Sequence, residues 1–200
     1  MPSLTDLNGH HEDLVARVIA YARAAGWREV PMTYHDRDGG DALRLANDMT
    51  GIFFRTLPDL VLTNGRRALM VEVKTGVFKH ANAASELFPI VMARDRWRVA
   101  RIPTLYVYEN PHFGVSAAWW GHEVFDDVPV TAIYMGTQRP EWREYMAWVR
   151  HWQSINLIPG DVPLKTIENR GSGDPYVVIP ERVLRTLLPW HVVLGDALGR

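Results

Sequence analysis

The strongest constraint on this chain is a pair of apolar segments joined by a tight turn, LPDLVLTNGRRALMVEVKTG, residues 57–76. Asn-Gly is the strongest short-range signal for a β-hairpin, because both residues tolerate positive φ. Alternate side chains of a strand share a face. One face of the hairpin is then mostly Leu and Val, which predicts packing against a helix. The other face carries Asp59, Glu72 and Lys74, and is expected to form a pocket floor or to meet solvent.

The length of the turn decides how the two carboxylates meet. A two-residue turn at Asn64-Gly65 places Thr63 opposite Arg66 and Asp59 opposite Met70, so that Glu72 is a diagonal neighbour of Asp59. A four-residue turn places Asp59 directly opposite Glu72. A three-residue turn separates them onto opposite faces unless a bulge intervenes. Two of the three turns therefore bring the charges together.

Two adjacent carboxylates in a partly buried strand pair need a positive partner. Left unpaired, they would cost several kcal/mol. Mg²⁺ removes this cost, since it takes one or two carboxylates and keeps several waters. Lys74, one strand step further, would then stand beside a phosphate and an attacking water, an arrangement suited to phosphodiester hydrolysis. The alternative is an edge hairpin with ordinary solvated charges, but ALMVEVK is too apolar for a solvated strand.

The rest of the chain alternates helical and strand patterns without repeats or a linker. The order of the first elements, α, β, β, β, α, β, predicts an α/β or α+β arrangement around a mixed sheet. The expected helices span about 11–25, with Gly26 as C-terminal cap, 85–100, with Ser85 as N-terminal cap and Pro89 in its first turn, and 139–153. The expected strands span 27–32, 104–109 and 130–136. A last strand and helix are expected within 174–188.

Pro58-Asp59 and Glu72-Val73-Lys74, on two strands of one hairpin, resemble the motif of the PD-(D/E)XK nuclease superfamily, which includes Holliday-junction-resolvase-like and restriction-endonuclease-like branches. The resemblance implies a restriction-endonuclease-like α/β core of helix, three-stranded meander, helix and fourth strand in about residues 10–110. A central mixed sheet would be flanked by helices. Residues 111–200 would form an α+β extension within a single nuclease domain.

The resemblance also implies roles for individual residues. Asp59, Glu72 and the backbone carbonyl of Val73 would bind Mg²⁺, with Mn²⁺ able to substitute, and Lys74 would orient or activate water. Glu12, near the start of the first helix, would be an auxiliary metal ligand, although an acid there is also favoured by the helix dipole alone. The implied activity is a Mg²⁺-dependent endodeoxyribonuclease.

A basic cluster follows the motif. Arg94, Arg96 and Arg98 on the predicted helix 85–100 could hold DNA phosphates, or could form a solvated face. Relatives often contribute a Gln or Lys to the site from this helix, and Arg94 is the nearest substitute by type. Lys79 and His80, just after the catalytic strand, are further candidates for phosphate contacts.

Composition limits the other possibilities. The net charge of -1 gives no general attraction to polyanions, so a DNA-binding surface must be local. The chain has no Cys, which excludes disulfides, a thiolate zinc site and a cysteine nucleophile. We expect a cytoplasmic protein without membrane contact, because we see neither a signal sequence nor a spanning segment.

Three functional hypotheses follow. The first is a structure-selective nuclease for branched or Holliday-junction DNA, and the second is a sequence-specific restriction-type enzyme. The third is a non-catalytic nucleic-acid-binding module that keeps the nuclease fold. A homodimer is expected for either enzyme, because cutting two strands needs two sites.

Overall fold

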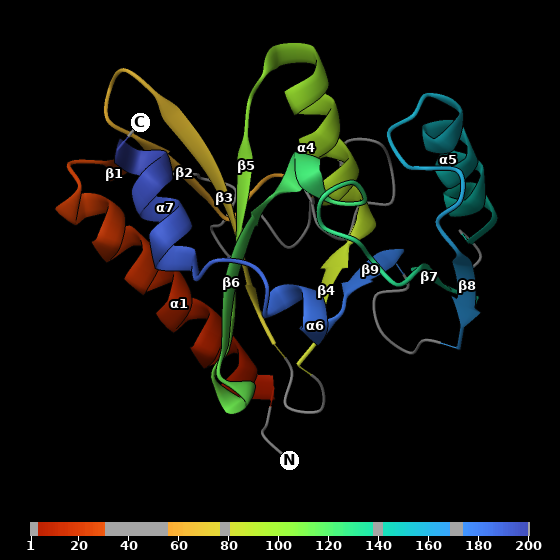
Figure 1. Ribbon diagram of the computed structural model, residues 1–200, viewed down its shortest axis with the longest axis horizontal. Helices are drawn as coiled ribbons and strands as arrows, with labels where there is room; N and C mark the ends of the chain where they lie inside the picture. Colours follow the sequence, from red (N-terminus) through yellow and green to blue (C-terminus); the bar gives the residue numbers. More distant parts are fainter. Residues whose placement is uncertain (1–3, 31–55, 77–80, 138–141, 169–173, 200) are drawn as a thin grey trace.

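The computed structural model describes residues 4–30, 56–76, 81–137, 142–168 and 174–199 of the 200-residue chain. They form two mixed β-sheets with helices packed around them (Figure 1). The predicted α/β class, with mixed sheets flanked by helices, is confirmed. Within these ranges, no helix is long and apolar enough to cross a bilayer.

The larger sheet has five strands in the order β1-β2-β3-β5-β6, and helices α1 and α7 pack on one of its faces. β1, β2 and β3 form an antiparallel meander, whereas β5 runs parallel to β3 and β6 returns antiparallel to β5. A parallel neighbour needs a crossover connection, and here the crossover contains β4 and α4. The elements are α1 (Leu4–Ala24), β1 (Arg28–Glu29), β2 (Leu60–Thr63), β3 (Ala68–Thr75), β4 (Ala83–Glu86), α4 (Leu87–Ala100), β5 (Thr104–Asn110), β6 (Val115–Trp120) and α7 (Trp190–Gly199).

The smaller sheet has four short strands in the order β4-β9-β7-β8. Its edge strand β4 comes from the crossover, while the other strands come from the C-terminal half of the chain. Residues after 110 therefore contribute strands to both sheets. The remaining elements are the 3-10 helices η2 (Pro111–Phe113) and η3 (Gly121–Glu123), β7 (Ile133–Gly136), α5 (Trp142–Ser154), β8 (Leu164–Ile167), β9 (Tyr176–Ile179) and α6 (Glu181–Leu184).

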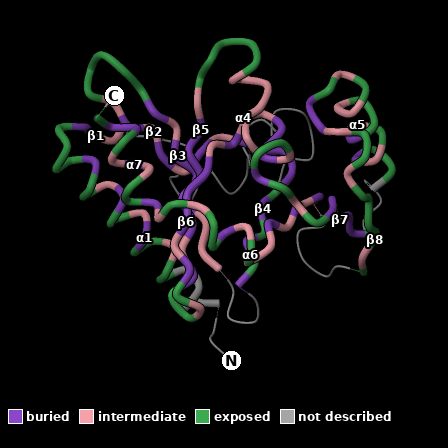
Figure 2. Tube along the Cα trace, viewed as in Figure 1, coloured by how far each residue is buried: buried purple, intermediate pink, exposed green. Residues whose placement is uncertain are grey.

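Each face of the larger sheet borders its own apolar core, and buried positions concentrate along its central strands (Figure 2). Under α1 and α7, the core contains the apolar hairpin face that the sequence predicts, namely Leu60, Leu62, Leu69, Val71 and Val73. The other core lies between the larger sheet, α4, α5 and the smaller sheet. Both cores together hold β3 between two apolar layers, so a charged side chain on this strand is exceptional.

Several expected boundaries differ from the structure. Ser85 does not cap α4; it is buried within β4, and Glu86 occupies the cap position without a side-chain cap bond. Gly26 has the expected positive φ, 80°, after α1. The predicted strand over 27–32 is confirmed only for Arg28–Glu29, and its residues beyond 30 lie outside the described ranges. The sequence analysis did not anticipate β4, β6, β8 or α7.

Candidate active site

The β2–β3 hairpin has a four-residue connection rather than the two-residue turn first considered. Thr63 pairs with Ala68 and Leu60 with Val71, which places Asp59 directly opposite Glu72. The longer turn forms because the Asn64 side chain accepts hydrogen bonds from the backbone amides of Arg66 (3.0 Å) and Arg67 (2.9 Å). The expectation that Asp59 faces Met70 is therefore wrong, and the four-residue alternative is observed.

Asp59 lies just before β2 and is hydrogen-bonded to the backbone of β3. Its Oδ2 accepts a hydrogen bond of 2.7 Å from the backbone N–H of Val73, and its Oδ1 lies 3.9 Å from Nε2 of His11 on α1. In an extended strand, the N–H and C=O of one residue point to the same side. The Val73 carbonyl is therefore directed to the side of the strand on which Asp59 lies.

Glu72 is a buried carboxylate on β3, with 6% of its surface exposed. Burial raises its pKa from 4.5 to about 7; the Lys74 ammonium opposes this change, and the Asp59 carboxylate adds to it. Desolvation disfavours the charged form of an acid, and a second negative charge has the same effect. The raised pKa of Glu72 therefore follows from its burial and from the neighbouring Asp59 carboxylate.

Lys74 is held between two carboxylates. Its Nζ lies 2.9 Å from Oε1 of Glu72 and 2.8 Å from Oε2 of Glu86, the last residue of β4. Burial by itself lowers the pKa of Lys74, but the carboxylates of Glu72, Glu86 and Asp59 together raise it well above its usual value. Lys74 is therefore an ammonium at neutral pH, a hydrogen-bond donor and not a base.

These groups fit a hard divalent cation. Among the described residues, no three acidic or histidine side chains converge as a ready ligand set. Asp59, Glu72 and the Val73 carbonyl nevertheless supply oxygen donors on one side of β3, and Mg²⁺ needs only one or two carboxylates because it keeps most of its waters. A cation would also stabilise the ionised form of Glu72 at a position where burial disfavours it.

The first helix presents His11 to this site. Glu12, proposed as an auxiliary ligand, is exposed on α1, whereas His11 is the residue that approaches Asp59. The helical periodicity of the sequence places Glu12 at the edge of the apolar face and His11 within it, which predicts a half-buried structural histidine at position 11. Position 11 is on the inner side of the helix, as its place in the apolar periodicity indicates.

The rear of the site closes tightly around the end of β3. The backbone N–H of Gly76 donates to the carbonyl of Glu109, 2.9 Å away, and a Cβ on Gly76 would overlap the Asn110 amide and the Tyr108 hydroxyl. Tyr108 also donates to the carbonyl of Ala81 over 3.3 Å. These contacts fix both described ends of the segment that carries Lys79 and His80, which themselves lie outside the described residues.

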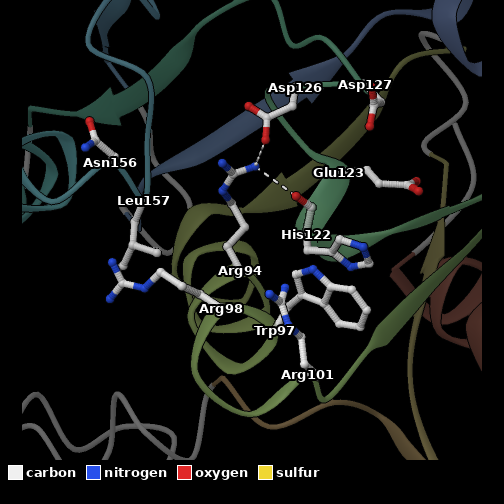
Figure 3. A pocket seen from close by; sticks show the side chains of 10 residues that line it. All are labelled: Arg94, Trp97, Arg98, Arg101, His122, Glu123, Asp126, Asp127, Asn156 and Leu157. Atoms are coloured by element: carbon white, nitrogen blue, oxygen red, sulfur yellow. Dashed lines mark hydrogen bonds and ion pairs between the residues drawn. The ribbon is translucent and has the colours of Figure 1, made fainter.

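The predicted basic cluster on α4 divides, because Arg94 and Arg98 line one cavity and Arg96 does not line it. Arg94 is largely buried; it donates to the carbonyls of His122 and Val124 and pairs with Asp126 at 3.0 Å (Figure 3). Its guanidinium is already occupied, so the prediction that Arg94 contacts DNA or replaces the Gln or Lys of relatives is not supported. Arg94 instead anchors the turn that follows β6.

Arg96 and Arg98 point in different directions. Arg98 is exposed, pairs with Asp95 at 2.8 Å, and lines a cavity of about 360 Å³ with Arg94, Trp97 and Arg101 (Figure 3). None of Asp59, Glu72 and Lys74 lines this cavity. Arg96 is partly buried and donates to Thr104 Oγ1 over 3.4 Å; burial lowers its pKa, while Tyr106 and Glu72 oppose that change. The three arginines do not form one continuous patch.

Glu86 is the residue of the site that the sequence did not reveal. It lies twelve positions beyond Lys74, and its place before an apolar helix indicated only a helix start. The contact with Lys74 exists because β4, an edge strand of the smaller sheet, contacts β3 of the larger sheet. No spacing rule within the motif anticipates this contact.

Comparison with solved structures yields likenesses of low similarity. The Holliday junction resolvase Hjc of the archaeal hyperthermophile Archaeoglobus fulgidus is similar over 93% of this chain and 96% of its own, with 12% sequence identity and a TM-score of 0.43. No model of a protein family matches the chain, and no curated protein matches it in sequence. The geometry of the site itself carries the functional argument.

Proposed function

We propose that this protein is a metal-dependent endonuclease that hydrolyses phosphodiester bonds in DNA. The observation that carries the proposal is the meeting of Asp59, Glu72 and Lys74 at the end of β3, where Glu72 is buried and its pKa is raised. A buried acid held near its titration point beside a second acid and an ammonium is typical of a functional site. A purely structural strand pair gains nothing from these charges.

Each residue has a distinct task in the proposed reaction. Asp59 and Glu72 hold the cation together with the Val73 carbonyl, and the Val73 N–H keeps Asp59 oriented. Lys74, protonated between Glu72 and Glu86, donates hydrogen bonds to the attacking water or to a phosphate oxygen and stabilises developing negative charge. The chemistry that Mg²⁺ or Mn²⁺ supplies when bound is Lewis-acid polarisation of the phosphate and of water.

The DNA substrate is proposed to be branched, with a homodimer providing one site for each strand. A sequence-specific restriction-type nuclease uses the same three residues and differs only in what the surrounding surface recognises. A non-catalytic binding module is the remaining alternative. The energetic cost of burying Glu72 beside Asp59 argues against it, because binding alone does not require both acids.

The test is cleavage of a panel comprising linear duplex, supercoiled plasmid, single strand, flap and four-way junction, in Mg²⁺ or in EDTA. Cutting is expected only in Mg²⁺, and Glu72→Ala and Lys74→Ala should each abolish it. Glu144→Gln and Arg23→Ala, exposed charge changes on α5 and α1, are matched controls that should cut normally. Cutting that persists in EDTA would place the chemistry elsewhere.

Calorimetry separates the enzyme from the binding module. The wild type should bind one or two Mg²⁺ or Mn²⁺ ions per chain, and Asp59→Asn should weaken that binding strongly. Equal ion binding by the wild type and Asp59→Asn, or none by either, would favour the module that lacks catalysis. This readout does not depend on finding the correct DNA.

A further inference from the structure

The outer face of the smaller sheet carries a row of four side chains that begins beside the catalytic lysine. Glu86 pairs with Tyr176, Tyr176 with Tyr134, and Tyr134 with Lys165. Residues directly opposite each other on neighbouring strands project from the same face. The row therefore crosses all four strands, β4, β9, β7 and β8, and we call it the tyrosine row.

The tyrosine row faces away from the core. The alternate residues of the same strands, such as Ser85, Val177 and Ile133, are buried, and Val177 and Ile133 belong to the core beneath α4 and α5. Glu86 and Lys165, at the two ends of the row, are exposed, and the two tyrosines are half-buried. A sheet face of this kind is available to a ligand.

The two tyrosines form a short aromatic stack with one side covered. Their ring centroids are 5.3 Å apart at an interplanar angle of 14°, and Nζ of Lys165 lies 5.8 Å from the centroid of Tyr134. Lys165 thus covers the β8 side of the stack. On the β4 side, the next residue of the row is Glu86, whose carboxylate is bound by Lys74 at 2.8 Å. A base added to the stack would therefore lie on the Tyr176 side, which is the side nearer to Lys74.

The charges around the row are compatible with a nucleic acid. Glu86 is paired with Lys74, which it shares with Glu72, and Asp174, the nearest acid along β9, accepts a hydrogen bond of 2.9 Å from the Tyr145 hydroxyl. Lys165 contributes a positive charge at the far end. Aromatic side chains on adjacent strands of an open sheet stack unpaired bases, because every base offers a π-face that a duplex conceals.

We propose that the tyrosine row binds an unpaired polynucleotide strand next to the cleaved phosphate, with a base stacked on Tyr176 and the backbone reaching Lys165. This inference rests on the proposed nuclease function for its orientation, since the row leads from Lys74. The substrate of the proposed nuclease would then be DNA with an unpaired stretch on one side of the cut. The smaller sheet is then a binding surface, and the larger sheet supplies the chemistry.

The experiment measures binding of two labelled DNAs of equal length, one fully paired and one with a single-stranded gap, in EDTA at fixed salt. The wild type should prefer the gapped DNA. Tyr134→Ala/Tyr176→Ala should weaken its binding about tenfold or more, because it removes the aromatic surface on which a base stacks. Affinity for the fully paired DNA should not change. Tyr176→Phe, which keeps the ring, should bind as the wild type does.

Two controls make the result decisive. Tyr21→Ala removes a partly exposed tyrosine from α1, and Arg23→Ala removes an exposed positive charge from the same helix; these two variants should leave gapped-DNA binding unchanged. Near-UV circular dichroism and Mg²⁺ calorimetry should show that the double variant is folded and retains its ion site. Unchanged gapped-DNA affinity in the double variant, equal losses for both DNAs, or no preference in the wild type would each overturn the inference.

The outcomes also separate this inference from the nuclease proposal. A protein that binds gapped DNA through the tyrosine row but never cuts it in Mg²⁺ refutes the nuclease proposal alone. If the wild type cuts DNA in Mg²⁺ and Tyr134→Ala/Tyr176→Ala binds gapped DNA normally, only the inference about the tyrosine row is refuted.

Discussion

The two sheets of this protein are built in opposite ways from the chain. The larger sheet takes β2 and β3 from one hairpin, so Asp59, Glu72 and Lys74 meet through contacts between sequence neighbours. The smaller sheet joins Ala83 of β4 to Ile179 of β9, which are 96 residues apart in the sequence. The comparison shows that the motif of a site can be local while the residues that complete it, here Glu86, depend on distant pairing.

The largest expected effect concerns whether the two sheets fold as one unit. Leu105 and Ile179 are fully buried, one in each core. Leu105→Ala and Ile179→Ala should each lower the free energy of unfolding by about 2–5 kcal/mol, because each creates a cavity. Chemical denaturation followed by fluorescence and circular dichroism should show one transition for both variants.

The exposed Leu188 is the control, and Leu188→Ala should change stability by less than about 0.5 kcal/mol. A separate early transition in Ile179→Ala alone would show that the smaller sheet unfolds independently. The two sheets would then belong to two separate domains.

A second prediction follows from the raised pKa of Glu72. Its folded pKa of about 7 lies above its ordinary value of 4.5, so the folded state of metal-free protein binds the proton more tightly. The stability due to this proton is fully present below pH 4.5 and is lost as pH rises through 7, and it amounts to about 3 kcal/mol. Urea denaturation in EDTA at several pH values measures the loss.

Glu72→Gln should remove this part of the pH dependence, while Glu144→Gln, an exposed change, should keep it. Mg²⁺ should stabilise the wild type above pH 7 and have little effect on Glu72→Gln. A wild type and Glu72→Gln with the same pH profile would show that Glu72 is not a destabilised acid in the folded chain.

The third prediction concerns the contacts of Arg94. Arg94→Ala should cost about 1–3 kcal/mol of stability, because it leaves Asp126 and two carbonyls without their donor. Arg98→Ala, which removes an exposed pair with Asp95, should cost at most about 1 kcal/mol. Thermal unfolding measures both. A normal stability for Arg94→Ala with weakened DNA binding would restore the original interpretation of this residue.

The smallest expected effect is on the rate of the proposed cleavage. It concerns Glu86, whose contact with Lys74 joins the smaller sheet to the larger one. Glu86→Gln should lower kcat about tenfold, equivalent to about 1.4 kcal/mol, with KM little changed, because Lys74 keeps its contact with Glu72. Glu86→Asp should recover part of the loss. Glu181→Gln, on α6, is the control. A loss as complete as that of Lys74→Ala would make Glu86 a primary component of the site.

Sequence reasoning recovered the parts of the fold that local chemistry determines. The apolar hairpin face and the first helix follow from periodicity and turn signals. The turn length did not follow, because it depends on the Asn64 side chain bonding to the amides of Arg66 and Arg67. An Asn-Gly pair indicates a turn without fixing how many residues it contains.

The remaining parts depend on tertiary pairing. Four-residue strands such as β4 and β8 carry too few side chains for a clear alternation, and Ser85 mimicked a helix cap while lying in a strand. The Arg94 cluster looked like a DNA-binding face because charge is visible in a sequence and burial is not. The Lys74–Glu86 contact required both the crossover and the distant β9 partner.

The tight packing at Gly76 has an evolutionary consequence. Because any β-carbon there would overlap Tyr108 and Asn110, these three positions should change together or not at all among diverged homologues. A coordinated substitution of the trio, found once more distant sequences are aligned, would mark descent more reliably than the short acidic motif does.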